Sequence, residues 1–138
     1  MIVSFGWTSP ALLAGVKTVT RRDWAPSHAA KFHKGMLVDA WNWSPRVVQR
    51  NPHKIAIIRL TEDPKLELTR DAPESDYDAE GFRYLTGLRQ RIGDLEPNEL
   101  WDEWTDFENL ARLWVIRFEV VEIVEVDADQ LVLPGVRA

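Results

Sequence analysis

The chain has 138 residues, no cysteine and a formal net charge of −5 at pH 7. This length fits a single domain, residues 1–138, with a sizeable hydrophobic core. The lack of cysteine excludes a disulfide framework, a thiolate nucleophile and a thiolate metal site. The N-terminal residues lack a signal-peptide pattern and no apolar run is long enough for a membrane span, so the sequence predicts a soluble cytoplasmic protein.

The charge is distributed unevenly along the chain. Residues 1–59 contain nine Lys and Arg against two Asp, a balance of +7, which leaves −12 for residues 60–138. Phosphate binding depends on local rather than total charge, so a basic face formed by the first half could still bind nucleic acid. The alternative is that the two halves interleave in the fold and their charges cancel.

Apolar runs and turn residues predict the elements of the first half. Residues 1–5 form a β-rich apolar run and predict the first strand. Pro10 occupies the preferred first position of a short helix that ends before Gly15. The elements expected next are a strand over 17–23, a helix over 27–33, a strand over 36–43 and a strand over 55–60.

The second half is predicted to contain two helices and the longest strand. The expected order is a short strand through Leu66 and Leu68, a helix from Ser75 with Glu80 in its first two turns, a helix from Pro97, a strand over 113–126 and a weakly structured tail over 126–138. In the helix from Pro97, apolar residues spaced by three and four predict a core-facing stripe. That stripe comprises Leu100, Trp101, Trp104, Phe107 and Leu110.

Five or six strands interrupted by short helices, without a βαβ rhythm, predict an α+β fold. The simplest arrangement is a small curved or closed sheet with short helices at its ends. The three histidines, His28, His33 and His53, lack the spacing of a helical metal pair, so neither a metal nor another cofactor is expected. The pattern makes no prediction of the oligomeric state.

The densest polar cluster of the sequence directly follows Gly15. Strand alternation places Thr18, Thr20 and Arg22 on one face and Lys17, Val19 and Arg21 on the other. One ammonium, two hydroxyls and two guanidiniums therefore meet within six residues. The cluster indicates either a functional site or, with equal weight, an exposed edge strand with solvated charges.

Two tryptophans share a face of the strand predicted over 36–43. Trp41 and Trp43 lie on that face together with Asp39. Such a set could form a base-stacking pocket, although packing in the core is the interpretation given more weight. The loop that follows carries Arg46 and Arg50, and it could either bind phosphate or be a solvated hairpin.

The polar cluster resembles the signature of a known family. Gly15-x-Lys17-Thr18-x-Thr20-x-Arg22, with the flanking Phe5-Gly6 and the downstream Ala79-Glu80-Gly81-Phe82, is similar to the motifs of ASCH domains, which belong to the PUA-like superfamily. The resemblance covers the chain from Met1 to about Glu125. It implies a PUA-like barrel that acts on RNA or a modified nucleoside.

Some ASCH proteins remove the acetyl group from N4-acetylcytidine with a lysine, a threonine and a glutamate. The resemblance assigns these roles to Lys17, Thr20 and Glu80. Thr20 Oγ would attack the amide carbonyl and a neutral Lys17 amine would take its proton. Glu80 would orient the lysine or protonate the leaving nitrogen. Alanine at position 17 or 20 is expected to abolish turnover and to leave the fold intact.

This assignment carries a geometric condition. Lys17 and Thr20 point to opposite faces of a regular strand, so they can cooperate only if Lys17 belongs to the turn after Gly15 or if a bulge redirects it.

Two further functions fit the same residues. A non-catalytic RNA-binding or modified-base-binding module would use Thr18, Arg21, Arg22, Arg46 and Arg50 as polar contacts and Trp41 or Trp43 for stacking. A ribonuclease, as described for other ASCH relatives, would use the Lys and Arg cluster to stabilise a pentavalent phosphate.

Overall fold

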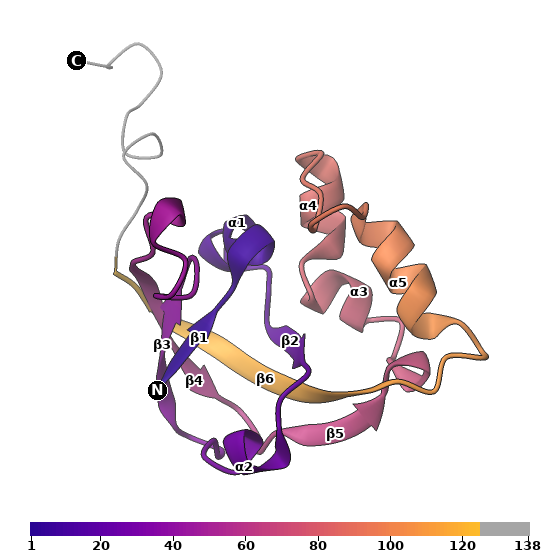
Figure 1. Ribbon diagram of the computed structural model, residues 1–138, viewed down its shortest axis with the longest axis horizontal. Helices are drawn as coiled ribbons and strands as arrows, with labels where there is room; N and C mark the ends of the chain where they lie inside the picture. Colours follow the sequence, from indigo (N-terminus) through magenta and orange to yellow (C-terminus); the bar gives the residue numbers. More distant parts are fainter. Residues whose placement is uncertain (125–138) are drawn as a thin grey trace.

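The structure, a computed structural model, describes residues 1–124 (Figure 1). The predicted tail over 126–138 lies outside the described residues. The strands are β1 (Ile2–Ser4), β2 (Val19–Arg22), β3 (Leu37–Trp41), β4 (Lys54–Leu60), β5 (Lys65–Leu68) and β6 (Arg112–Ile123). The helices are α1 (Ser9–Leu13), α2 (Pro26–Ala29), α3 (Asp76–Ala79), α4 (Phe82–Gly87) and α5 (Pro97–Thr105), with 3-10 turns at Gly6–Thr8, Val48–Arg50 and Thr69–Asp71.

The six strands of the described residues form one curved sheet. Its order is β1-β3-β4-β6-β2, and β5 pairs with β6 beyond β4. The pair β1–β3 is parallel and the other pairs are antiparallel. β6, the longest strand as predicted, crosses the whole molecule, and the sheet is open between its two end strands, β1 and β2 (Figure 1). The α+β class with a curved sheet and short helices is therefore confirmed.

The main core lies on one face of this sheet. Strand alternation directs Val38, Ala40, Ile58, Ile116 and Phe118 into it, and each of these side chains is buried. Core packing of the tryptophan face of β3 is therefore a wrong prediction. β3 buries its small and branched residues, and its opposite face, with Trp41, lies outside this core.

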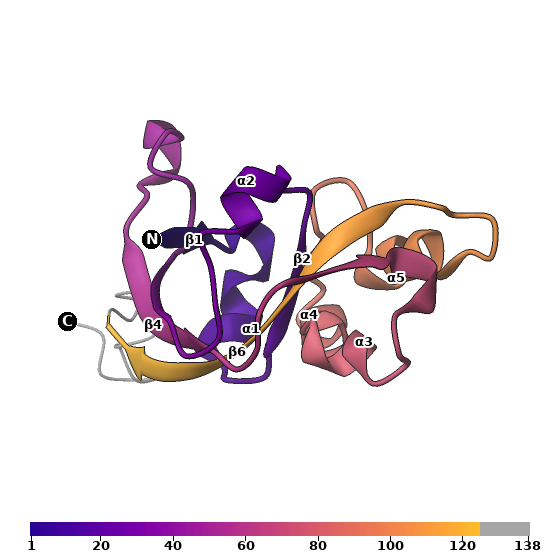
Figure 2. The same cartoon turned by 90° about the horizontal axis from the view of Figure 1, so that it is seen from below.

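A second apolar cluster joins the helices α3, α4 and α5. Figure 2 shows these helices gathered at the end of the molecule where β5 and the start of β6 lie. Trp101 and Trp104 of α5 pack against the buried Phe82, as the predicted stripe requires. The stripe ends earlier than predicted, because α5 stops at Thr105 and Phe107 is 82% exposed. None of the described helices is long and apolar enough to cross a bilayer.

The helix predicted from Ser75 is in fact two short helices with a break at Glu80 and Gly81. Gly81 has φ +87°, a conformation that disfavours any side chain. A Cβ at Gly81 would lie 2.4 Å from Ala11 Cβ, so α1 can approach the break only because residue 81 is glycine. The break thereby fixes Glu80 beside the segment that follows α1.

Gly81→Ala is expected to destabilise the protein by roughly 2–4 kcal/mol, since the left-handed conformation and the overpacking both add cost. Urea unfolding of the two proteins measures this difference. Gly87→Ala is the matched control, because a Cβ at Gly87 meets nothing within 4 Å. Equal unfolding midpoints for the Gly81 and Gly87 variants would contradict the account of the break.

Candidate active-site cleft

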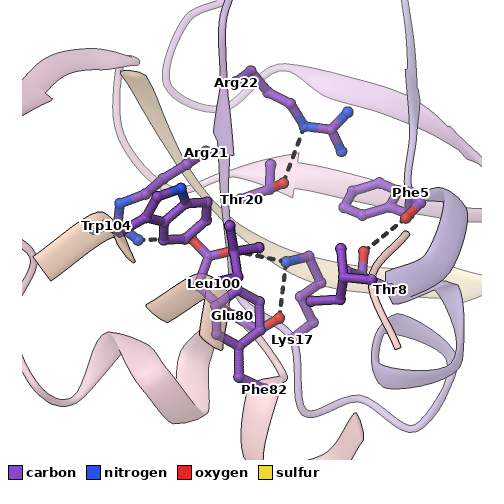
Figure 3. Close-up of a pocket in the computed structure, with 11 residues that line it drawn as sticks. Phe5, Thr8, Lys17, Thr20, Arg21, Arg22, Glu80, Phe82, Leu100 and Trp104 are labelled. Carbon is purple, nitrogen blue, oxygen red and sulfur yellow. Dashed lines mark hydrogen bonds and ion pairs between the residues drawn. The ribbon is translucent and has the colours of Figure 1, made fainter. Parts of the chain in front are cut away.

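A cleft of about 180 Å³ opens between the end of β1, the start of β2 and the helices α4 and α5 (Figure 3). Its polar lining consists of Thr8, Lys17, Thr20, Arg21, Arg22 and Glu80. Its apolar lining consists of Phe5, Phe82, Ile92, Leu100 and Trp104. The cleft therefore combines aromatic walls with a dense set of ionisable groups. Within residues 1–124, no group of His, Cys, Asp and Glu side chains could hold a metal ion.

Lys17 lies in the turn that connects α1 to β2. The strand predicted over 17–23 begins only at Val19. Strand alternation therefore does not determine the direction in which the Lys17 side chain points. Backbone hydrogen bonds hold this turn, from Lys17 N to Ala11 O at 3.2 Å and from Thr18 N to Ala79 O at 2.8 Å. Lys17 and Thr20 consequently line the same cleft, which meets the geometric condition set by the motif.

The ammonium of Lys17 is held by one residue. Its Nζ donates to the Glu80 carboxylate oxygen Oε1 and to the Glu80 backbone oxygen, both at 2.9 Å. The Lys17 residue is 1% exposed. The Lys17 side chain is thus fixed in position by the residue at the break between α3 and α4.

Glu80 belongs to a buried network of alternating charges. Arg21 donates to Glu80 Oε2 at 2.6 Å and to Asp76 at 2.6 Å. Arg117 of β6 donates to both oxygens of Asp76 at 2.8 and 2.9 Å. Carboxylates of the acidic second half of the chain therefore neutralise cations of the basic first half. At this site the two halves interleave and their charges cancel, which was the alternative to a basic face.

The surroundings of Lys17 favour its neutral form. Burial lowers the pKa of Lys17 below its ordinary value of 10.5. The Glu80 carboxylate opposes this change, whereas the positive charges of Arg22 and Arg21 add to it. The amine form of Lys17 is therefore more accessible than in a solvated lysine.

Thr20 and Arg22 form the other polar side of the cleft. The Thr20 hydroxyl accepts a hydrogen bond from Arg22 Nε at 3.0 Å, and the guanidinium lies 5.3 Å from the centre of the Phe5 ring. Burial lowers the pKa of Arg22 to about 10, although the negative charge of Glu80 acts in the other direction and raises it. Thr20 is 4% exposed, so its hydroxyl is accessible only to a group that enters the cleft.

The other predicted residues lie elsewhere or have other partners. Arg21 lines the cleft, but its two carboxylate partners occupy its guanidinium. Thr18, Trp41, Trp43, Arg46 and Arg50 do not line the cleft. Thr18 and Arg46 are exposed, and the indole Nε1 of Trp41 is buried.

Trp43 and Arg50 instead form a surface cluster with Trp7. The guanidinium of Arg50 lies 4.4 Å from the Trp43 ring and 4.8 Å from the Trp7 ring. The two rings meet edge to face at 5.1 Å. The sequence does not predict this cluster, because Trp7 is distant in the chain from Trp43 and Arg50.

Asp76 and Arg117 are site residues that the sequence analysis missed. Asp76 lies in an acidic run that also suits a solvated helix start, yet it is only 2% exposed. Arg117 interrupts a run of apolar residues in the middle of β6, and a cation at such an inner position is the signal in the sequence that could have identified it. Both residues support Glu80 through Arg21.

The geometry defines a class of protein, an α+β domain with a charged cleft at the opening of a curved half-barrel sheet. One solved structure with this fold is protein EF3133 from Enterococcus faecalis V583, a DUF984 protein. The TM-score is 0.54 and the identity 19%, over 88% of this chain and 74% of that chain. At this identity the match shows the fold alone. No family model matches the chain, and no curated protein matches it.

Proposed function

We propose that this protein is a hydrolase that removes the acyl group from an N4-acylated cytidine, with Thr20 as the nucleophile and Lys17 as its base. The observation that carries the proposal is a buried lysine of lowered pKa that lines the same small cleft as a threonine hydroxyl. The ASCH-like motif supports the choice of substrate.

The hydrogen bonds of Lys17 suit a general base. A neutral amine has two N–H groups, and the two Glu80 oxygens can accept both of them. The remaining position on Nζ then holds the lone pair. As Thr20 Oγ bonds to the acyl carbon, its proton passes to Lys17 Nζ, and the resulting ammonium returns that proton to the departing nitrogen. Water then cleaves the acyl ester on Thr20 and regenerates the hydroxyl.

In this mechanism Glu80 is a positioning residue. Both of its carboxylate oxygens already accept hydrogen bonds, one from Lys17 and one from Arg21. An ionised carboxylate held in this way has no proton for the leaving nitrogen. Of the two roles expected for Glu80, the geometry supports orientation of the lysine.

The size and walls of the cleft support a small planar substrate group. A volume of about 180 Å³ is below the range of roughly 300–1,000 Å³ that is usual for sites of drug-sized ligands. Phe5, Phe82 and Trp104 offer aromatic surface against which a single base could pack.

Release of cytidine from N4-acetylcytidine, followed chromatographically, tests the proposal. Thr20→Ala is expected to reduce kcat/KM by roughly a thousandfold or more, because the nucleophile is lost. Thr20→Ser is expected to retain part of the activity, since the hydroxyl survives and only the methyl that restricts its rotamer is removed.

Thr18→Ala is the matched control, because Thr18 is exposed and does not line the cleft. Full activity of Thr20→Ala would remove the proposed nucleophile. If the wild type hydrolyses none of a panel of acylated nucleosides, the binding-module function becomes the better one.

A specific observation favours that second function, a module that binds RNA or a modified base without catalysis. Trp7, Trp43 and Arg50 form an aromatic and cationic surface in the region of the basic loop. Single-stranded nucleic acids bind to such surfaces through stacking and phosphate contacts. A ribonuclease is less well supported, because carboxylates already neutralise Lys17 and Arg21.

If the protein binds single-stranded RNA, its affinity is expected to fall steeply with salt, since each phosphate contact contributes about −0.7 to the logarithmic slope. Replacing Arg46 and Arg50 with Ala should flatten the slope measured by fluorescence anisotropy. The double variant Arg59→Ala/Arg83→Ala controls for net charge, because both residues are exposed cations that are each already paired with a carboxylate. An unchanged slope in the double variant would exclude this surface as the phosphate contact.

A further inference from the structure

Arg22 differs from the other cations of the cleft in its partners. Lys17 and Arg21 each form an ion pair with Glu80, whereas Arg22 forms none with any of residues 1–124. Its Nε donates to Thr20, and its two terminal nitrogens, Nη1 and Nη2, have no hydrogen-bond partner in this part of the chain. These terminal nitrogens are not sealed from solvent, and the guanidinium lies at the cleft beside Phe5 (Figure 3).

A guanidinium in such a place is suited to bind an anion. Removing a charge from water is costly, and the lowered pKa of Arg22 shows that this cost exceeds the stabilisation from the nearby charge of Glu80. The two terminal nitrogens form a planar fork that matches a carboxylate or a phosphate with two parallel hydrogen bonds. No hydrogen bond or ion pair joins this fork to Glu80, whose charge only partly offsets the effect of burial on the pKa of Arg22.

We propose that Arg22 forms an anion subsite which binds a carboxylate on the acyl group of the substrate. This inference rests on the proposed hydrolysis at Thr20. It specifies the substrate as an N-acylated nucleoside whose acyl chain carries an acid, in preference to a simple acetyl derivative.

The position of Thr20 relative to Arg22 places the carboxylate near the bond that is cleaved. Arg22 Nε lies 3.0 Å from Thr20 Oγ. Given the width of a guanidinium and the length of a hydrogen bond, an oxygen bound by Nη1 or Nη2 lies at most about 8 Å from Thr20 Oγ. A short dicarboxylic acyl chain fits this limit. A 5′-phosphate is separated from an N4-acyl group by the whole base and the sugar.

Four substrates with one scissile amide test the proposal. They are N4-acetylcytidine, its 5′-monophosphate, N4-succinylcytidine, and the methyl ester of the succinyl compound, which has nearly the same length without the charge. The wild type is expected to hydrolyse the succinyl compound with a kcat/KM roughly ten- to a hundredfold above that of its ester. In Arg22→Gln this ratio is expected to fall to about one, and Arg22→Lys should give an intermediate ratio.

The ratio is a safe readout because both substrates are compared on the same variant. Any displacement of Thr20 by the lost Arg22 contact affects both rates and cancels. Circular dichroism and thermal unfolding establish that each variant is folded. A ratio near one in the wild type, or an unchanged ratio in Arg22→Gln, would overturn the proposal. A preference for N4-acetylcytidine 5′-monophosphate over the succinyl compound would assign the subsite to phosphate and overturn the carboxylate assignment.

A binding experiment separates this inference from the proposed function. If no acylated cytidine is hydrolysed, the proposed function fails, and succinate and inorganic phosphate are titrated into the wild type and Arg22→Gln by calorimetry. Succinate binding that Arg22→Gln loses would support the carboxylate subsite without any turnover. The absence of succinate binding, or binding of equal strength in both proteins, would overturn it.

Discussion

Lys17→Met is expected to reduce kcat/KM for an N4-acylated cytidine by roughly a hundred- to ten-thousandfold, the usual contribution of a general base. Methionine fills a similar volume but has no amine to take the Thr20 proton. The same substitution leaves Glu80 Oε1 buried without its donor, which costs about 1–3 kcal/mol. Kinetics are therefore measured well below the unfolding midpoint, which thermal denaturation determines.

The buried position of Lys17 makes methionine a better test than alanine. Although the sequence leads to the expectation that Lys17→Ala leaves the fold intact, the structure leads us to expect a loss of stability, because Lys17 is among the largest fully buried side chains of the described residues. Alanine would leave a cavity and would remove one of the two cations that pair with the Glu80 carboxylate, since Arg21 still pairs with Oε2. Methionine avoids most of the cavity, so the loss of activity in Lys17→Met should remain when this variant and the wild type are assayed equally far below their unfolding midpoints. Wild-type activity of Lys17→Met under these conditions would show that Lys17 acts only through the structure.

The pH dependence of Lys17→Met provides a second readout. Burial lowers the pKa of Lys17 below 10.5, and only the neutral amine can act as base. Wild-type kcat/KM should therefore rise with pH through this lowered pKa, and the rise should be absent from the residual activity of the variant. Between the folded-state pKa and 10.5 the unfolded chain binds more protons, so this group makes stability increase with pH in that window.

The sequence predicted the strands better than the faces of the strands. In β6 the polar residues Arg117 and Glu119 alternate with Ile116 and Phe118, and both of these apolar residues are buried. In β3 both faces carry apolar residues, so alternation alone cannot identify the buried one. The large size of tryptophan led to the prediction that the face with Trp41 is buried. The core of the curved sheet instead contains the smaller Val38 and Ala40.

The candidate site was predictable only where the motif defines it. Lys17, Thr20 and Glu80 come from the motif, and the break at Gly81 that brings Glu80 to Lys17 is not visible in a helical pattern. The partners of Asp76 were not predictable, because they lie 55 and 41 positions away in the chain. Such pairs depend on how α3 packs against β2 and β6, which no local pattern encodes.

Asp76→Ala is expected to lower the free energy of unfolding by about 3–5 kcal/mol, more than Gly81→Ala or Lys17→Met. The reason is that it leaves the guanidiniums of Arg21 and Arg117 without their shared carboxylate. Urea unfolding at pH 7 measures the difference in the free energy of unfolding. Asp78→Ala is the matched control, since Asp78 lies on the same helix and forms an exposed pair with Arg83. Such surface pairs contribute about 0–1 kcal/mol.

Acid titration of the Asp76 variant tests whether charge is the cause. Burial alone would raise the pKa of Asp76, but the hydrogen bonds from Arg117 and Arg21 hold it below its ordinary 3.8. Its contribution is complete above pH 3.8 and is lost as the pH falls through the lowered pKa, where the carboxylate becomes protonated in the folded state. The wild type should therefore lose stability in this acid range, and Asp76→Asn should lose less. Parallel curves for the two proteins would mean that Asp76 stabilises the fold through packing, and that the charge network does not support Glu80.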